Sequence, residues 1–164
     1  VASVGGIRAD LCPGSLVVPH QIIDYTWGRK STFHEGSEAP VVHVDFTDPY
    51  EQALRQRILR AAAAAGEAVA DGAVYAATQG PRLETAAEIN RLERDGCDVV
   101  GMTGMPEAVL ARELGIPYAA INVVANYAAG RAASASGICF DSIDTVLREA
   151  MGRVRRVLDH ICEA

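Results

Sequence analysis

Residues 73–125 read AVYAATQGPRLETAAEINRLERDGCDVVGMTGMPEAVLARELGIPYAAINVVA and alternate between two patterns. Apolar runs typical of buried strands occupy residues 73–78, 98–102 and 118–125. Between them lie two segments with helical composition, residues 85–94 and 106–114, which end near Gly96 and Gly115. Short helices between continuous apolar strands predict an α/β fold, with a largely parallel sheet covered on both faces.

The flanking sequence predicts further elements on both sides of this stretch. Two β-rich runs bounded by turn residues predict strands at residues 16–18 and 41–46, and the second run contains His43. Residues 51–65 have helical spacing and end before Gly66. The last helix is the clearest, because apolar side chains recur every three or four residues from Ile143 to Ile161.

Length and composition limit the kind of protein. With 164 residues, the chain has the length of one domain, so we expect a single domain over residues 1–164. The net charge of -6 offers no basic surface for nucleic acid or an anionic membrane. No apolar run reaches the roughly 20 residues of a membrane-spanning helix. Four cysteines without paired spacing favour reduced thiols and a cytoplasmic location.

Polar side chains follow each of the three predicted central strands. Glu84 lies in the loop after the first strand, Thr103 after the second and Asn126 after the third. Ligands bind beyond the carboxyl ends of parallel strands, so we expect these side chains at one sheet edge, around a polar, planar ligand. Each has a purely structural alternative in a turn, a helix cap or a loop. Motifs for nucleotide phosphates, dinucleotides, zinc proteases and hydrolase elbows are absent, and the histidines have no metal-ligand spacing.

Three ordered motifs carry a family resemblance. GPRLETAAE at residues 80–88, MTGMPE at 102–107 and then Asn126 resemble the trimeric purine nucleoside phosphorylase and 5'-methylthioadenosine phosphorylase family. The resemblance implies a three-layer α/β fold with a mixed, largely parallel central sheet. It also implies that the chain is roughly the C-terminal two-thirds of a member, without the N-terminal phosphate-loop segment. Such enzymes replace a purine on ribose with inorganic phosphate and use no metal or other cofactor.

The resemblance assigns the purine site. Glu84 and Asn126 are the implied catalytic residues that bind the base, and Leu83 is the residue that stacks on it. A carboxylate accepts from the N1–H of a 6-oxopurine, whereas adenine has no hydrogen there. Members that take 6-aminopurines carry Asp where this chain has Asn126 and Ala128. We therefore expect hypoxanthine to be preferred over adenine.

The same resemblance assigns the ribose, phosphate and 5' positions. Met102 is expected under the ribose, and Thr103 is expected on the phosphate together with a loop that contains Ala2, Ser3 and Gly5. An apolar pocket for a 5'-alkylthio group is implied for His43, Ile143, Val146 and Leu147. Because the strand that carries His43 reaches a neighbouring subunit in the family, a homotrimer is implied.

Together these assignments predict phosphorolysis of S-methyl-5'-thioinosine to hypoxanthine and 5-methylthioribose 1-phosphate. One alternative is a general 6-oxopurine nucleoside phosphorylase for inosine and guanosine, and another is a 5'-methylthioadenosine phosphorylase. A third alternative is a purine-binding assembly module without catalysis. Without the family's basic phosphate-binding residues, we expect residues 1–164 alone to be inactive.

Overall fold

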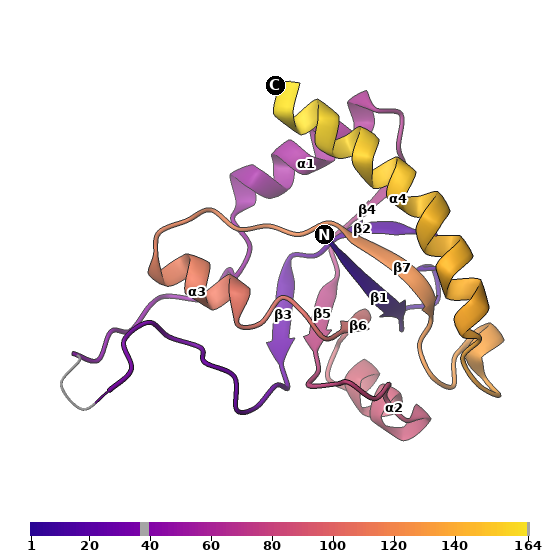
Figure 1. Ribbon diagram of the computed structural model, residues 1–164, viewed down its shortest axis with the longest axis horizontal. Coiled ribbons are helices and arrows are strands. Elements are labelled where there is room, and N and C mark those ends of the chain that lie inside the picture. The colour runs from indigo at the N-terminus through magenta and orange to yellow at the C-terminus, as the bar shows by residue number, and fades with distance from the viewer. Residues whose placement is uncertain (37–39, 164) are drawn as a thin grey trace.

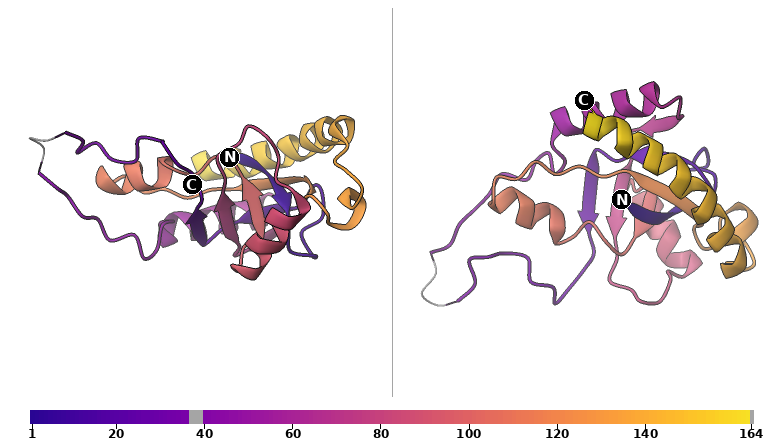
Figure 2. Two further views of the ribbon diagram at one scale, coloured as in Figure 1. Left: turned by 90° about the horizontal axis from the view of Figure 1, so that it is seen from below. Right: turned by 45° about the horizontal axis from the view of Figure 1, so that its top comes forward.

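The computed structural model describes residues 1–36 and 40–163. Its strands are β1 (Ala2–Gly6), β2 (Leu16–Val18), β3 (Gln21–Asp24), β4 (Val69–Asp71), β5 (Val74–Ala77), β6 (Val99–Gly101) and β7 (Asn122–Tyr127). Its α-helices are α1 (Gln52–Ala64), α2 (Ala86–Arg94), α3 (Glu107–Glu113) and α4 (Phe140–Glu163), and a 3₁₀ turn covers Ala132–Ser134. Figures 1 and 2 show the helices around one curled sheet, from which the described residues on either side of 37–39 project.

The seven strands form one mixed sheet in the order β3-β5-β6-β1-β7-β2-β4. Four of the six neighbouring pairs are parallel, whereas β1 is antiparallel to β6 and β2 is antiparallel to β7. The prediction of a largely parallel, mixed α/β sheet is confirmed. However, β7 runs against β5 and β6, so its carboxyl end does not share their edge of the sheet.

Side-chain alternation along the strands separates the core into layers. On β7, Val124 joins the cluster covered by α3, and Val123 joins the cluster under α1 and α4. On β6, Val99 faces the α3 side and Val100 packs with α2. Because neighbouring residues of a strand point to opposite faces, α3 covers one face and the other three helices cover the opposite face. The three-layer fold is confirmed.

Local sequence explains where the helices begin. Glu51 caps α1 by accepting from the backbone N–H groups of Ala53 and Leu54. Thr85 and Glu88 form a reciprocal capping box at the start of α2, as the sequence T-x-x-E favours. On α4, Ala150, Val154 and Val157 are buried against the sheet, which confirms the predicted amphipathic helix.

Two predictions about the first 50 residues need correction, and two short strands were not predicted. Residues 41–46 form no strand, and His43 is exposed on an extended segment. This segment alternates like a strand but pairs with no strand of the described chain, so Val41 remains 80% exposed. The predicted loop with Ala2, Ser3 and Gly5 is the strand β1 inside the sheet. The short strands β3 and β4 were not predicted.

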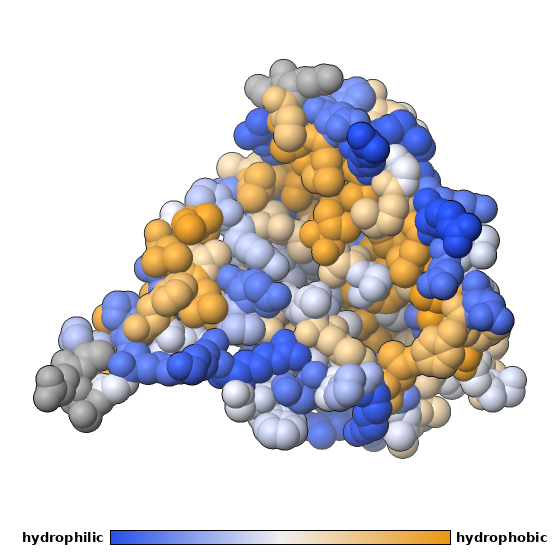
Figure 3. Space-filling view, viewed as in Figure 1, coloured by the Kyte–Doolittle hydropathy of each residue, from blue (hydrophilic) through white to orange (hydrophobic). Residues whose placement is uncertain are grey.

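One face of the molecule exposes apolar side chains. Figure 3 shows them over α3 and along α4. Leu114 and Ile116 are exposed at the end of α3, and Met151 and Leu158 are exposed on α4. None of the helices that the structure describes has both the length and the apolar character needed to cross a membrane. An exposed apolar surface of this kind is typical of an interface with another protein surface.

We predict that Gly6→Ala destabilises the fold by about 1–3 kcal/mol, because the new methyl group overpacks a filled site. A Cβ on Gly6 would meet the main-chain oxygen of Leu11 and the side chain of Val124. The measurement is the free energy of unfolding in urea. Gly152→Ala is the control, because that site on α4 is open and alanine favours helix by about 1 kcal/mol. Equal effects of the two substitutions would contradict the prediction.

Candidate functional site

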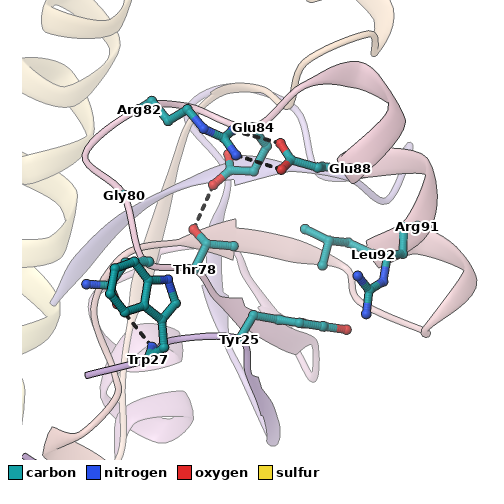
Figure 4. A pocket seen from close by; sticks show the side chains of 10 residues that line it. Tyr25, Trp27, Thr78, Gly80, Arg82, Glu84, Glu88, Arg91 and Leu92 are labelled. Atoms are coloured by element: carbon teal, nitrogen blue, oxygen red, sulfur yellow. Dashed lines mark hydrogen bonds and ion pairs between the residues drawn. The ribbon is translucent and has the colours of Figure 1, made fainter. Parts of the chain in front are cut away.

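The loop after β5 carries the predicted base-binding carboxylate. Thr78, the first residue after the strand, donates its hydroxyl to Glu84 Oε1 at 2.7 Å (Figure 4). The main chain of Thr78 is fixed in turn, because its N–H donates to the carbonyl of Gly101 at 2.8 Å. The Glu84 carboxylate is therefore connected through Thr78 to the ends of two neighbouring strands.

An ion pair anchors the far side of this loop. Arg82 donates to both oxygens of Glu88, at 2.8 and 2.7 Å, and the N–H of Thr85 donates to the same carboxylate at 2.7 Å. The Arg82 hydrogen bond, followed by that of Thr85, lowers the pKa of Glu88 to about 2. Glu88 therefore remains charged at neutral pH and ties the loop to the start of α2.

A cleft of about 330 Å³ opens beside Glu84. Tyr25 and Trp27, which follow β3, form one side of it, and Arg91 and Leu92 of α2 contribute another (Figure 4). The indole of Trp27 is 73% exposed, and its backbone N–H donates to the side chain of Gln79. The cleft combines aromatic surfaces with a carboxylate, which suits a planar polar ligand.

Thr103 lies at a second, smaller cavity of about 140 Å³. Its N–H donates to the Tyr75 hydroxyl at 3.1 Å, and the two hydroxyl oxygens are 3.2 Å apart. Either hydroxyl can donate in this second contact, and burial raises the pKa of Tyr75. In the arrangement in which Tyr75 donates, the proton of Thr103 is left for an acceptor in the cavity. Asn122 also lines the cavity; within the described residues, neither polar atom of its fully buried side chain has a hydrogen-bond partner.

A register shift places Asn126. Val4 pairs with Val124, but Gly5 pairs with Asn126, which leaves Ala125 as an extra residue on β7. Such a bulge re-aims the side chains that follow it. Gly5 also pairs with Val100, which packs with α2, so Asn126 shares the α2 face of the sheet. Its Nδ2 donates one hydrogen to the Tyr127 carbonyl at 2.6 Å, and the second remains available.

The other predicted base and ribose residues lie just after the strands, Met102 after β6, Ala128 after β7 and Leu83 in the loop after β5. Met102 packs against Gly80, at a distance that leaves no room for a Cβ. Ala128 contacts Gly5, with its Cα 3.4 Å from the position of a Cβ there. Leu83 is 38% exposed on the loop that carries Glu84. Glu84 and Thr103 line two different cavities, and Asn126 and Met102 line neither of these two.

The predicted 5' pocket is not assembled within one chain. The segment that carries His43 projects from one side of the molecule, whereas the first turns of α4 lie on the opposite side (Figures 1 and 2). Ile143, Val146 and Leu147 are half-buried in those turns. His43 could meet them only across an interface between two chains.

Several functional candidates were missed by the sequence analysis. Thr78 is the polar last residue of the strand predicted at residues 73–78, and that position is the signal that could have found it. Tyr75 and Asn122 lie within apolar strands, and no sequence signal identified their polar role. Arg29 donates to the carbonyls of Thr78, Gln79 and Met105, and so links the loop after β5 to the loop after β6.

Among the described residues, no group of three or more acidic, histidine or cysteine side chains could hold a metal ion.

Comparison with known proteins identifies the family. A family model described as the phosphorylase superfamily matches residues 1–163. The chain belongs to the phosphorylase superfamily. A probable S-methyl-5'-thioinosine phosphorylase from Pseudomonas syringae pv. tomato is 52% identical over 164 residues, covering 100% of this chain and 66% of that relative. A probable 6-oxopurine nucleoside phosphorylase from Thermococcus kodakarensis is 46% identical over 134 residues, covering 79% of this chain and 50% of that relative.

A solved superfamily structure has the same fold. The methylthioadenosine phosphorylase of Schistosoma mansoni, in complex with adenine, matches with a TM-score of 0.90 and 28% identity. The match covers 98% of this chain and 62% of that chain. The chain thus spans less than two thirds of the length of these phosphorylases.

We predict that the Glu88 carboxyl titrates near pH 2 and that Arg82→Gln raises this midpoint towards the ordinary value of 4.5. Because the folded pKa is lowered, the stabilisation from this pair is complete above about pH 4.5 and is lost as the pH falls through about 2. Carbon-13 NMR of the carboxyl group measures both midpoints. A wild-type midpoint near 4.5 would show that the Arg82 anchor does not form in solution.

Proposed function

We propose that the full-length protein phosphorolyses S-methyl-5'-thioinosine, releasing hypoxanthine and 5-methylthioribose 1-phosphate. In this proposal inorganic phosphate is the co-substrate, and no metal or organic cofactor takes part. The observation that carries the proposal is the Glu84 carboxylate, which Thr78 holds beside a cleft with aromatic walls. The 52% identity to a probable enzyme of this specificity supports it.

The proposed base recognition depends on matching the hydrogen-bond donors and acceptors of the purine with those of the site. Glu84 offers carboxylate oxygens to the N1–H of a 6-oxopurine, and Asn126 has one N–H left for N7 or O6. Adenine would present an acceptor at N1 and an amino group at C6, so it would leave both side chains badly paired. A site built around such polar pairs discriminates by about 10⁴-fold, which favours hypoxanthine as the leaving base.

The proposed reaction breaks the bond between C1' of the ribose and N9 of the purine. As this bond lengthens, positive charge grows on the sugar and negative charge grows on the purine. Asn126 would stabilise the purine charge at N7 or O6 through its free N–H, and Glu84 would hold the base by N1–H. The attacking phosphate would sit near Thr103, whose hydroxyl would donate to it while Tyr75 donates to the Thr103 oxygen.

A homotrimer follows from the same proposal. The segment with His43 lies away from the start of α4, so the apolar 5' pocket would need a neighbouring copy. The exposed side chains of Leu114, Ile116 and Met151 supply apolar surface for subunit contacts.

All four cysteines are free thiols, which supports the proposed cytoplasmic location.

The Thermococcus relative favours a second candidate, a general 6-oxopurine nucleoside phosphorylase. Both candidates use Glu84 and Asn126 in the same way and differ at the 5' end of the ribose. A 5'-hydroxyl left unpaired against Ile143, Val146 and Leu147 would cost about 1–3 kcal/mol. A module that only binds purines would take hypoxanthine with no dependence on phosphate.

We predict that the full-length protein releases hypoxanthine from S-methyl-5'-thioinosine only when phosphate is present. Inosine should react more slowly by about tenfold or more, because its 5'-hydroxyl lacks a partner in an apolar pocket. Release of the free base is followed by absorbance, with methylthioadenosine, which would release adenine, as the third substrate. Equal rates for inosine would contradict the 5' assignment, and a reaction with methylthioadenosine alone would contradict the base assignment.

We predict that the double variant Asn126→Asp, Ala128→Asp shifts selectivity towards 6-aminopurines by at least about tenfold. An aspartate at residue 126 accepts from an amino group, whereas an amide donates to an oxo group. The measurement is the ratio of kcat/KM for methylthioadenosine to that for methylthioinosine. Ala129→Asp, next to the changed positions but outside the assigned site, is the control. An unchanged ratio in the double variant would exclude Asn126 as the residue that selects the base.

A further inference from the structure

The Thr78 hydroxyl has two acceptors within reach and one proton to give. Glu84 Oε1 lies at 2.7 Å, and the carbonyl oxygen of Gly101 lies at 3.2 Å. Hydrogen bonds to a charged carboxylate are shorter and stronger than those to a neutral carbonyl. The proton is therefore directed to Glu84, and Oε1 is turned towards the end of β5.

This contact changes what the carboxylate can offer to a purine. Hypoxanthine presents a single donor, N1–H, to a carboxylate beside it, and one oxygen satisfies that donor. Guanine presents N1–H and the adjacent 2-amino group, which pair best with both oxygens of a carboxylate in a planar fork. Thr78 already uses one of the two acceptor sites of Oε1, so that fork would have to share this oxygen with the Thr78 hydroxyl.

We propose that Thr78 is a specificity-determining residue that restricts the site to 6-oxopurines without a 2-amino group. It acts by keeping Glu84 Oε1 away from the substrate, so that Oε2 alone receives N1–H. The inference rests on the proposed function and adds to it the exclusion of guanine derivatives. Thr78 contacts the carboxylate of Glu84 and not the substrate, so its proposed role is that of a positioning residue.

The test compares two nucleosides with the same sugar, 5'-methylthioinosine and 5'-methylthioguanosine, in the full-length protein. Wild type should favour the inosine compound in kcat/KM by about tenfold, the worth of one hydrogen bond to a charged group. Thr78→Val should reduce this preference to near unity by improving the KM of the guanosine compound. Thr78→Ser keeps the hydroxyl and should restore the preference.

Thr32→Val is the matched control, because it removes another hydroxyl that contacts a carboxylate, that of Glu113, away from the cleft. It should leave the preference unchanged. If Thr78 were merely structural, Thr78→Val would lower both activities together and keep their ratio, and that result would overturn the inference. Equal wild-type activity on the two nucleosides would overturn it without any variant, so the test does not depend on Thr78→Val folding.

Calorimetric binding of free hypoxanthine and free guanine separates this inference from the proposed function. If neither nucleoside reacts, but the protein prefers hypoxanthine and Thr78→Val removes that preference, the proposed reaction is wrong and the role of Thr78 is supported. If the nucleosides react and Thr78→Val leaves both the kinetic and the binding preference intact, the reaction stands and the role of Thr78 is refuted.

Discussion

The pairing of β1 with β6 joins the two halves of the sheet. On one side lie β3, β5 and β6, and on the other lie β7, β2 and β4, so β1 is the strand between them. The contact with β6 uses Gly5 opposite Val100 and Gly6 opposite Val99. Both glycines are in crowded surroundings, since a Cβ on Gly5 would lie 3.2 Å from Val100 Cγ1 and one on Gly6 would meet the main chain of Leu11. The relative position of the two halves depends on this close approach.

The candidate site uses one group from each half. Thr78 and Glu84 follow β5, whereas Asn126 belongs to β7, and β1 and β6 lie between these strands. The shift between Val4 and Gly5 brings Asn126 into register with Gly5 and Val100 instead of leaving it on the face of Val124. A bulge is a common way to re-aim a side chain next to a functional site. The register shift between β1 and β7 therefore gives Asn126 the position on which the proposed base recognition depends.

Much of the fold was predictable because its signals are local. The helix predicted at residues 85–94 and the apolar stripe of α4 each depend on residues a few positions apart, and both are confirmed. Residues 41–46 have the alternation of a strand, but a strand also needs a partner, which the sequence does not reveal. The prediction that the carboxyl ends of β5, β6 and β7 share one edge was wrong for a related reason. It assumed that the central strands are all parallel, whereas β1 lies between β6 and β7 and runs antiparallel to β6. Family motifs identified Glu84, but the contact that orients it comes from Thr78, a residue that local patterns describe only as the end of a strand.

The anchors around Glu84 also explain how a loop can be selective. A carboxylate on a free loop could turn to meet one donor or two, and it would accept both kinds of 6-oxopurine. Here Arg82 and Glu88 fix the far side of the loop, and Arg29 fixes its near side through the carbonyls of Thr78 and Gln79. With the backbone held at both sides, the Thr78 hydroxyl has to orient only the carboxylate itself. In the proposed role of Thr78, one hydrogen bond is then enough to influence base choice, because the entropy of ordering the loop has already been lost on folding.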